Sequence, residues 1–150
     1  MHASRSSLLA LLCLLAGCVT NPYAAPPDVA APPADATRLP SGLAYRVLQP
    51  GSGSEHPALS DTITVNYTGW TQDGHKFDST AAPDGSRAPV SFPLGKLIKG
   101  WQEAVPLMVA GETLRVWIPS EMAYGDHPTR ADHPPAGPLV FDIELVSIQH

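Results

Sequence analysis

Five short segments, well separated along the chain, carry the residues that could do chemistry. In chain order they are Val65-Asn66-Tyr67-Thr68-Gly69, Phe77-Asp78-Ser79, Gly100-Trp101, Ala123-Tyr124-Gly125 and Leu139-Val140-Phe141-Asp142. Together they supply an apolar aromatic set with the carboxylate of Asp78 and the phenol of Tyr124. Converging aromatic side chains form an apolar cavity in which a few polar groups orient a ligand. We therefore expect chemistry that depends on the shape of a pocket.

Other kinds of chemistry have no starting point in this sequence. It contains no Gly-x-Ser-x-Gly elbow for a serine nucleophile and no Gly-x-x-x-x-Gly-Lys loop for phosphates. His127, Asp132 and His133 lie in a proline-rich segment without the spacing typical of metal ligands, so we predict neither a metal nor a cofactor. The formal net charge of −5 and the absence of a Lys/Arg-rich run argue against a nucleic-acid partner.

Alternation of apolar and polar residues predicts several strands that position these segments. In Thr62 to Thr68, for example, Ile63, Val65 and Tyr67 share one face, so Tyr67 is expected to point inward. Similar alternation occurs around residues 43–47, 90–92, 114–118 and 139–145. Asp73-Gly74 is a hairpin signal, residues 79–89 are expected to form an exposed flap, and residues 121–138 a long polar loop.

One short helix is predicted near Gly100 or Trp101. Trp101, Val105 and Met108 fall on one face at positions i, i+4 and i+7, and Pro106 limits the helix because it removes a backbone donor. Strands around one such helix predict an α+β fold, in which a twisted antiparallel β-sheet wraps around one short amphipathic helix.

In order and spacing, the five segments resemble the FKBP-type peptidyl-prolyl cis-trans isomerases, from about Leu43 to Ile148. The resemblance implies an FKBP-like fold and a pocket that receives the proline of Xaa-Pro segments in folding proteins. It also implies rapamycin-like or tacrolimus-like macrolides as ligands and requires no cofactor. A non-catalytic peptide-binding or chaperone role through the same groove remains an alternative.

The resemblance also implies roles for individual residues. The expected catalytic residues are Tyr67, Asp78, Trp101, Tyr124 and Phe141. The expected substrate-binding residues are Phe77, Val90, Leu97, Ile98 and His133. Val90 and His133 stand where many relatives have an aromatic residue and an isoleucine, which implies a more polar rim.

The first residues are typical of a processing signal. Arg5 gives a positive start, Leu8 to Ala16 is apolar, and Leu15-Ala16-Gly17-Cys18 is similar to the lipobox of bacterial lipoproteins. We expect residues 1–17 to be a signal peptide and Cys18 to be lipidated. Val19 in place of an aspartate then implies an outer-membrane protein that faces the periplasm. An ordinary secretory signal is the alternative.

The segment that follows is rich in alanine and proline. Residues 18–38 are therefore expected to be a lipidated cysteine and an extended tether, and residues 39–150 the isomerase domain. Larger periplasmic relatives add a helical dimerisation segment that residues 19–38 cannot build, so we expect a monomer.

Overall fold

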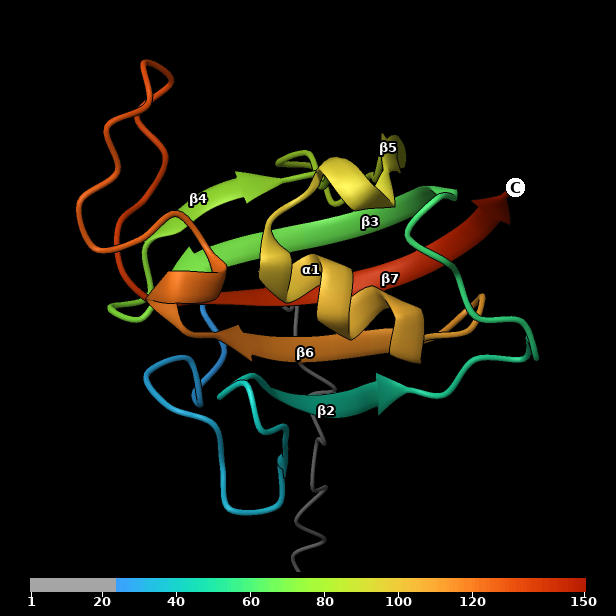
Figure 1. Cartoon of the computed structure of the whole chain (residues 1–150), viewed down its shortest axis with the longest axis horizontal. Coiled ribbons are helices and arrows are strands. Elements are labelled where there is room, and N and C mark those ends of the chain that lie inside the picture. Colours follow the sequence, from blue (N-terminus) through green and yellow to red (C-terminus); the bar gives the residue numbers. More distant parts are fainter. Residues whose placement is uncertain (1–23) are drawn as a thin grey trace, which may run out of the picture.

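A computed structural model describes residues 24–150, in which the strands form one antiparallel sheet. The strands are β1 (Thr37–Arg38), β2 (Ala44–Gln49), β3 (Thr62–Thr71), β4 (Lys76–Ser79), β5 (Val90–Pro93), β6 (Thr113–Ile118) and β7 (Leu139–Gln149). Their spatial order is β1-β2-β6-β7-β3-β4, and β5 also pairs with β3 (Figure 1). The predicted α+β architecture is confirmed.

The pair β3 and β7 forms the centre of the sheet, from Thr62 opposite Gln149 to Thr71 opposite Leu139, with a shift of register between Thr64 and Val65. Ile63 and Val65 of β3 and Ile143 and Leu145 of β7 are fully buried on the inner face of the sheet. Because side chains alternate between faces along a strand, this packing fixes the register and directs Tyr67 to the same inner side.

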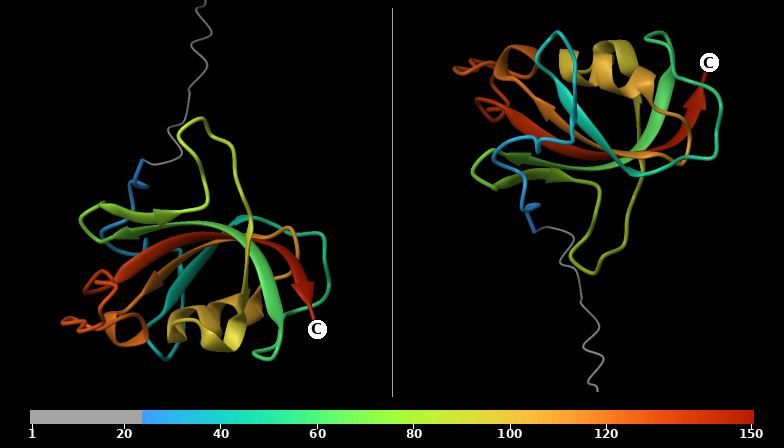
Figure 2. Two further views of the ribbon diagram at one scale, coloured as in Figure 1. Left: turned by 90° about the horizontal axis from the view of Figure 1, so that it is seen from above. Right: turned by 90° about the horizontal axis from the view of Figure 1, so that it is seen from below.

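The helix lies on that inner face (Figure 2). Helix α1 spans Lys99–Ala104, and a 3₁₀ turn at Val105–Leu107 continues it through Pro106. The predicted short helix, tightened at its end by the proline, is confirmed. A Cβ atom on Gly100 would lie 2.5 Å from Ile118 of β6, so glycine allows the helix to approach the sheet closely. Trp101 and Ala104 are thereby buried.

The outer face of the sheet is covered by residues 24–36, which we call the strap. The carbonyl oxygen of Asp28 accepts a hydrogen bond of 2.9 Å from the Trp117 indole, and its carboxylate lies 2.9 Å from the Arg115 guanidinium. Val29 and Ala36 pack against a buried cluster formed by Ala44, Trp117 and Val140. Composition predicts an extended tether over residues 18–38, whereas residues 24–38 lie against the sheet.

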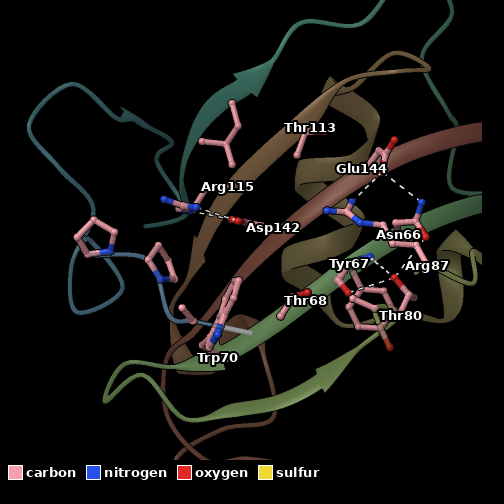
Figure 3. Close-up of a pocket in the computed structure, with 15 residues that line it drawn as sticks. Asn66, Tyr67, Thr68, Trp70, Thr80, Arg87, Thr113, Arg115, Asp142 and Glu144 are labelled. Carbon is pink, nitrogen blue, oxygen red and sulfur yellow. Dashed lines mark hydrogen bonds and ion pairs between the residues drawn. The ribbon is translucent and has the colours of Figure 1, made fainter. Parts of the chain in front are cut away.

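The flap at residues 79–89 also lies on the outer face (Figure 2). Its Arg87 is 3.1 Å from Glu144 of β7, and the backbone N–H of Tyr67 donates to the Thr80 hydroxyl. A hollow of about 350 Å³ separates the strap from the flap (Figure 3). The guanidinium groups in this hollow, those of Arg87 and Arg115, are each paired with a carboxylate. The hollow is therefore a polar contact region between the strap and the flap, in which both guanidinium groups already have carboxylate partners within the protein.

Residues 24–150 contain no helix with the length and apolar character needed to cross a bilayer.

The strap contacts predict a stabilising role for Asp28. Asp28→Ala should lower the free energy of unfolding by about 1–2 kcal/mol, because it removes a charge-assisted hydrogen bond to a largely buried Arg115. Urea unfolding measures the difference. Asp35→Ala is the matched control, because Asp35 is largely exposed and lies 3.7 Å from the partly exposed Arg46; its effect should stay within about 0.5 kcal/mol. If both substitutions changed the free energy of unfolding equally, the contact between the strap and Arg115 would not be a stabilising one.

A second prediction concerns Gly69 of β3. A Cβ atom at this position would lie 2.7 Å from both Phe77 and Phe141. Gly69→Ala should therefore destabilise the protein by about 1–3 kcal/mol through overpacking. Phe77→Leu removes one of the clashing ring atoms, so the double variant should be less destabilised than the sum of the two single variants. Strict additivity in urea unfolding would contradict this explanation.

Candidate active site

A cavity of about 200 Å³ opens on the inner face of the sheet, beside the start of α1. Its lining combines side chains from β3, β4, β5, β7 and α1 with two connecting segments. The lining residues are Tyr67, Phe77, Asp78, Phe92, Leu97, Ile98, Trp101, Tyr124 and Phe141. The fold thus brings together residues that lie far apart in the sequence.

Edge-to-face packing of aromatic rings forms the base of this cavity. The Trp101 ring lies 5.3 Å from Tyr67 at 88° and 5.4 Å from Phe141 at 89°, and Phe77 meets Phe141 at 5.5 Å and 90°. Perpendicular rings at this separation place the positive edge of one ring on the negative face of another. Each ring therefore holds its neighbours in orientation, and Trp101, at 4% exposure, closes the floor.

Asp78 is held by Tyr67 across the wall of the pocket. The Tyr67 hydroxyl donates a hydrogen bond of 2.5 Å to Oδ2 of Asp78, and the backbone N–H of Ser79 donates to Oδ1. Burial, together with the adjacent Asp78 carboxylate, raises the pKa of Tyr67 far above its usual value. The phenol therefore remains a donor, and the pair acts as one fixed polar unit.

Two further donors at the rim are free to bind a ligand. Within residues 24–150 the Tyr124 hydroxyl and the Ile98 backbone N–H have no hydrogen-bond acceptor. Ile98 directly precedes α1, and its own carbonyl accepts from the N–H groups of Trp101 and Gln102. Burial is the main cause that raises the pKa of Tyr124, so this phenol also stays protonated.

Two of the ten residues expected in the site lie outside the lining of the cavity. Val90 is paired with Val65 in the sheet, and its short side chain packs against the core. His133 is exposed in the 121–138 loop, at a positive φ of 48°. The structure brings the other eight expected residues together.

Phe92 is a lining residue that the sequence analysis missed. It lies two residues after Val90 in β5, and its ring centroid is 6.2 Å from that of Tyr67. The signal for it is the alternation Val90-Ser91-Phe92, which places Val90 and Phe92 on one face and gives only Phe92 the length to reach the pocket. The flap at residues 79–89, expected to affect which peptides enter, contributes no residue to this cavity.

The polar groups of the cavity do not resemble a metal site. Asp78 is its only carboxylate, and no cluster of three or more His, Cys, Asp or Glu residues in the described range could hold a metal ion.

This chain is similar in sequence and in structure to several known proteins. The chain is 41% identical over 111 residues to "Outer membrane protein MIP" of Legionella longbeachae, which covers 74% of this chain and 46% of that protein. It is 36% identical to "FK506-binding protein 1" of Candida glabrata, covering 73% of this chain and 96% of that protein. The crystal structure of FkpA from Escherichia coli superposes with a TM-score of 0.68 and 37% identity, over 78% of this chain and 53% of that one.

The chain thus spans about half the length of several of the curated relatives that it matches, and nearly the whole length of the yeast protein. The sequence model of one family, described as "FKBP-type peptidyl-prolyl cis-trans isomerase", matches residues 53–146. These residues include every side chain that lines the aromatic cavity, and on this evidence the chain belongs to the FKBP-type peptidyl-prolyl cis-trans isomerases.

Proposed function

We propose that this chain catalyses cis-trans isomerisation of Xaa-Pro peptide bonds through the aromatic cavity. The observation that carries the proposal is the combination of a rigid apolar socket with two unoccupied donors at its rim. Trp101, Tyr67 and Phe141 form the socket, and Ile98 and Tyr124 supply the donors. A proline ring fits an apolar socket, and the adjacent peptide carbonyls fit the donors.

The reaction needs a pocket that favours a rotated bond. Rotation of an Xaa-Pro bond crosses a barrier of about 18–20 kcal/mol, because resonance gives the C–N bond partial double-bond character. The twisted bond has lost that resonance and carries less charge separation than the planar one. A site poor in water therefore favours the twisted state relative to the planar state, which lowers the barrier.

The polar residues then take distinct roles. The Ile98 N–H and the Tyr124 hydroxyl can donate to carbonyl oxygens on either side of the rotating bond and so hold the peptide while the bond turns. Asp78 and Tyr67 form a prearranged dipole on the wall, where the carbonyl of the residue before proline would rotate. No proton is transferred in this scheme, so catalysis depends on positioning.

The proposed setting is outside the cytoplasm, with Xaa-Pro segments of folding proteins as substrates. It is supported by the signal pattern of residues 1–17 and by the name "Outer membrane protein MIP" of one relative. The signal peptide and lipidated Cys18 lie outside the described residues, and we propose them as the membrane anchor of a monomeric periplasmic domain. Rapamycin-like and tacrolimus-like macrolides are proposed ligands, in line with the name "FK506-binding protein 1" of another relative.

Substitutions in the socket test the activity. Trp101→Leu and Asp78→Ala should each lower kcat/KM for cis-to-trans relaxation of a proline-containing peptide by tenfold or more, since a tenfold loss corresponds to about 1.4 kcal/mol in the barrier. Asp84→Ala in the outer-face flap is the matched control and should leave the rate unchanged, because Asp84 is remote from the cavity lining.

Measurements on the wild-type chain separate catalysis from simple binding. If the wild-type chain binds unfolded clients but does not accelerate the relaxation, the non-catalytic chaperone alternative replaces the proposal. Inhibition of the wild-type rate by rapamycin would place the activity in the aromatic cavity.

The raised pKa values of Tyr67 and Tyr124 predict the behaviour at alkaline pH. In the folded protein both phenols ionise at higher pH than an ordinary tyrosine, whose pKa is about 10, so kcat/KM should be flat from about pH 7 to about pH 9. Above about pH 10 these tyrosines ionise more readily in the unfolded chain, so the free energy of unfolding should fall as pH rises. Tyr124→Phe should reduce that slope in urea titrations; an unchanged slope would contradict the assignment.

A further inference from the structure

A second hollow adjoins the aromatic cavity on the side of the 121–138 loop. It has a volume of about 420 Å³ and shares Leu97, Ile98 and Tyr124 with the cavity. Its remaining lining is Lys96, Ala123, His127, Pro128, Thr129 and Arg130. We call it the annex. A peptide whose proline occupied the cavity would have neighbouring residues within reach of the annex, because an extended chain advances about 3.3 Å per residue.

The annex carries positive charge in a chain that is acidic overall. Lys96 and Arg130 line it, no Asp or Glu does, and the net charge of the chain is −5. Among residues 24–150 no carboxylate lies within ion-pair distance of the Lys96 ammonium. Lys96 is therefore a cation available to a ligand.

Arg130 connects the annex to the aromatic cavity. Its guanidinium lies over the Tyr124 ring, 5.5 Å from the centroid, which is a cation–π geometry. It also forms an ion pair of 2.7 Å with Asp132, but both side chains are about 60% exposed. An exposed pair of this kind is worth little, so a carboxylate of the substrate can compete with Asp132 for Arg130.

We infer that the annex is a specificity subsite for an acidic side chain, Asp or Glu, within about two residues of the substrate proline. The inference rests on the proposed isomerase function and adds a substrate class to it. Lys96 and Arg130 bind the carboxylate, and His127 offers a further polar contact at the edge. The aromatic cavity has an apolar floor that receives the proline ring. The annex selects the residues next to that proline by their charge.

Matched peptides test the inference. In each pair, Glu replaces Gln at one position, one or two residues before or after proline, so that size is constant and only charge changes. At low ionic strength, kcat/KM should be about two- to fivefold higher for the Glu peptide of at least one pair, the range expected for exposed charge pairs. The ratio should fall toward one as salt is added.

Variants assign the preference to the annex. Lys96→Gln combined with Arg130→Gln should bring the Glu/Gln ratio close to one, because neither residue then carries a positive charge. Lys99→Gln is the control for Lys96→Gln, because Lys99 is an exposed cation nearby that does not line the annex. Asp132→Asn should raise the ratio, because it removes the competitor for Arg130 and a repulsive charge.

Each outcome decides between the possibilities. A ratio near one for every wild-type pair, or an equal loss of preference in Lys99→Gln and Lys96→Gln, would overturn the subsite. Turnover of the Gln peptides shows independently whether the isomerase function holds. If the chain isomerised the Glu and Gln peptides equally well, the proposed isomerase function would hold and the proposed acidic subsite would be wrong.

Discussion

The edge-to-face contact of Trp101 with Tyr67 and Phe141 is the interaction on which the site depends. These rings are part of the hydrophobic core and at the same time the inner surface of the cavity. A cavity usually weakens a core, because its lining atoms lose packing partners. Here the perpendicular rings support one another from the sides around a hollow of about 200 Å³. Stability and ligand binding are therefore properties of the same contacts.

The two faces of the sheet meet different physical requirements. The inner face carries α1 and the aromatic socket, whereas the outer face carries the strap, the flap and a polar network. Arg115 joins β6 to β7 through a two-point contact with Asp142, of 2.7 and 2.8 Å, and reaches Asp28 of the strap with its remaining nitrogen. One guanidinium thus ties two neighbouring strands to the N-terminal segment, as its fixed fork of donors allows.

The sequence predicts the elements near the site better than it predicts the strap. The strands and the short helix follow from periodicity, because burial on one face leaves a regular pattern. The resemblance to FKBP-type isomerases implies ten site residues, and eight of them line the cavity. Residues 24–36 have no such pattern, since their contacts depend on a few groups such as Asp28 and on a distant sheet face. Trp117 is the signal that could have revealed it. It lies between the core residues Val116 and Ile118, so its large apolar ring points to the opposite face of the sheet and requires a cover there.

The docked strap also determines how the domain is presented. The strap, whose Ala24 lines the outer hollow, lies on the side of the sheet opposite α1 and the aromatic socket (Figure 2). Residue 24 is the sixth residue after Cys18, so the chain between them spans at most about 22 Å when fully extended. If Cys18 is acylated as proposed, the domain is held close to the membrane, with the outer face of the sheet toward the lipid. The aromatic cavity then faces away from the membrane, toward polypeptides that diffuse past it.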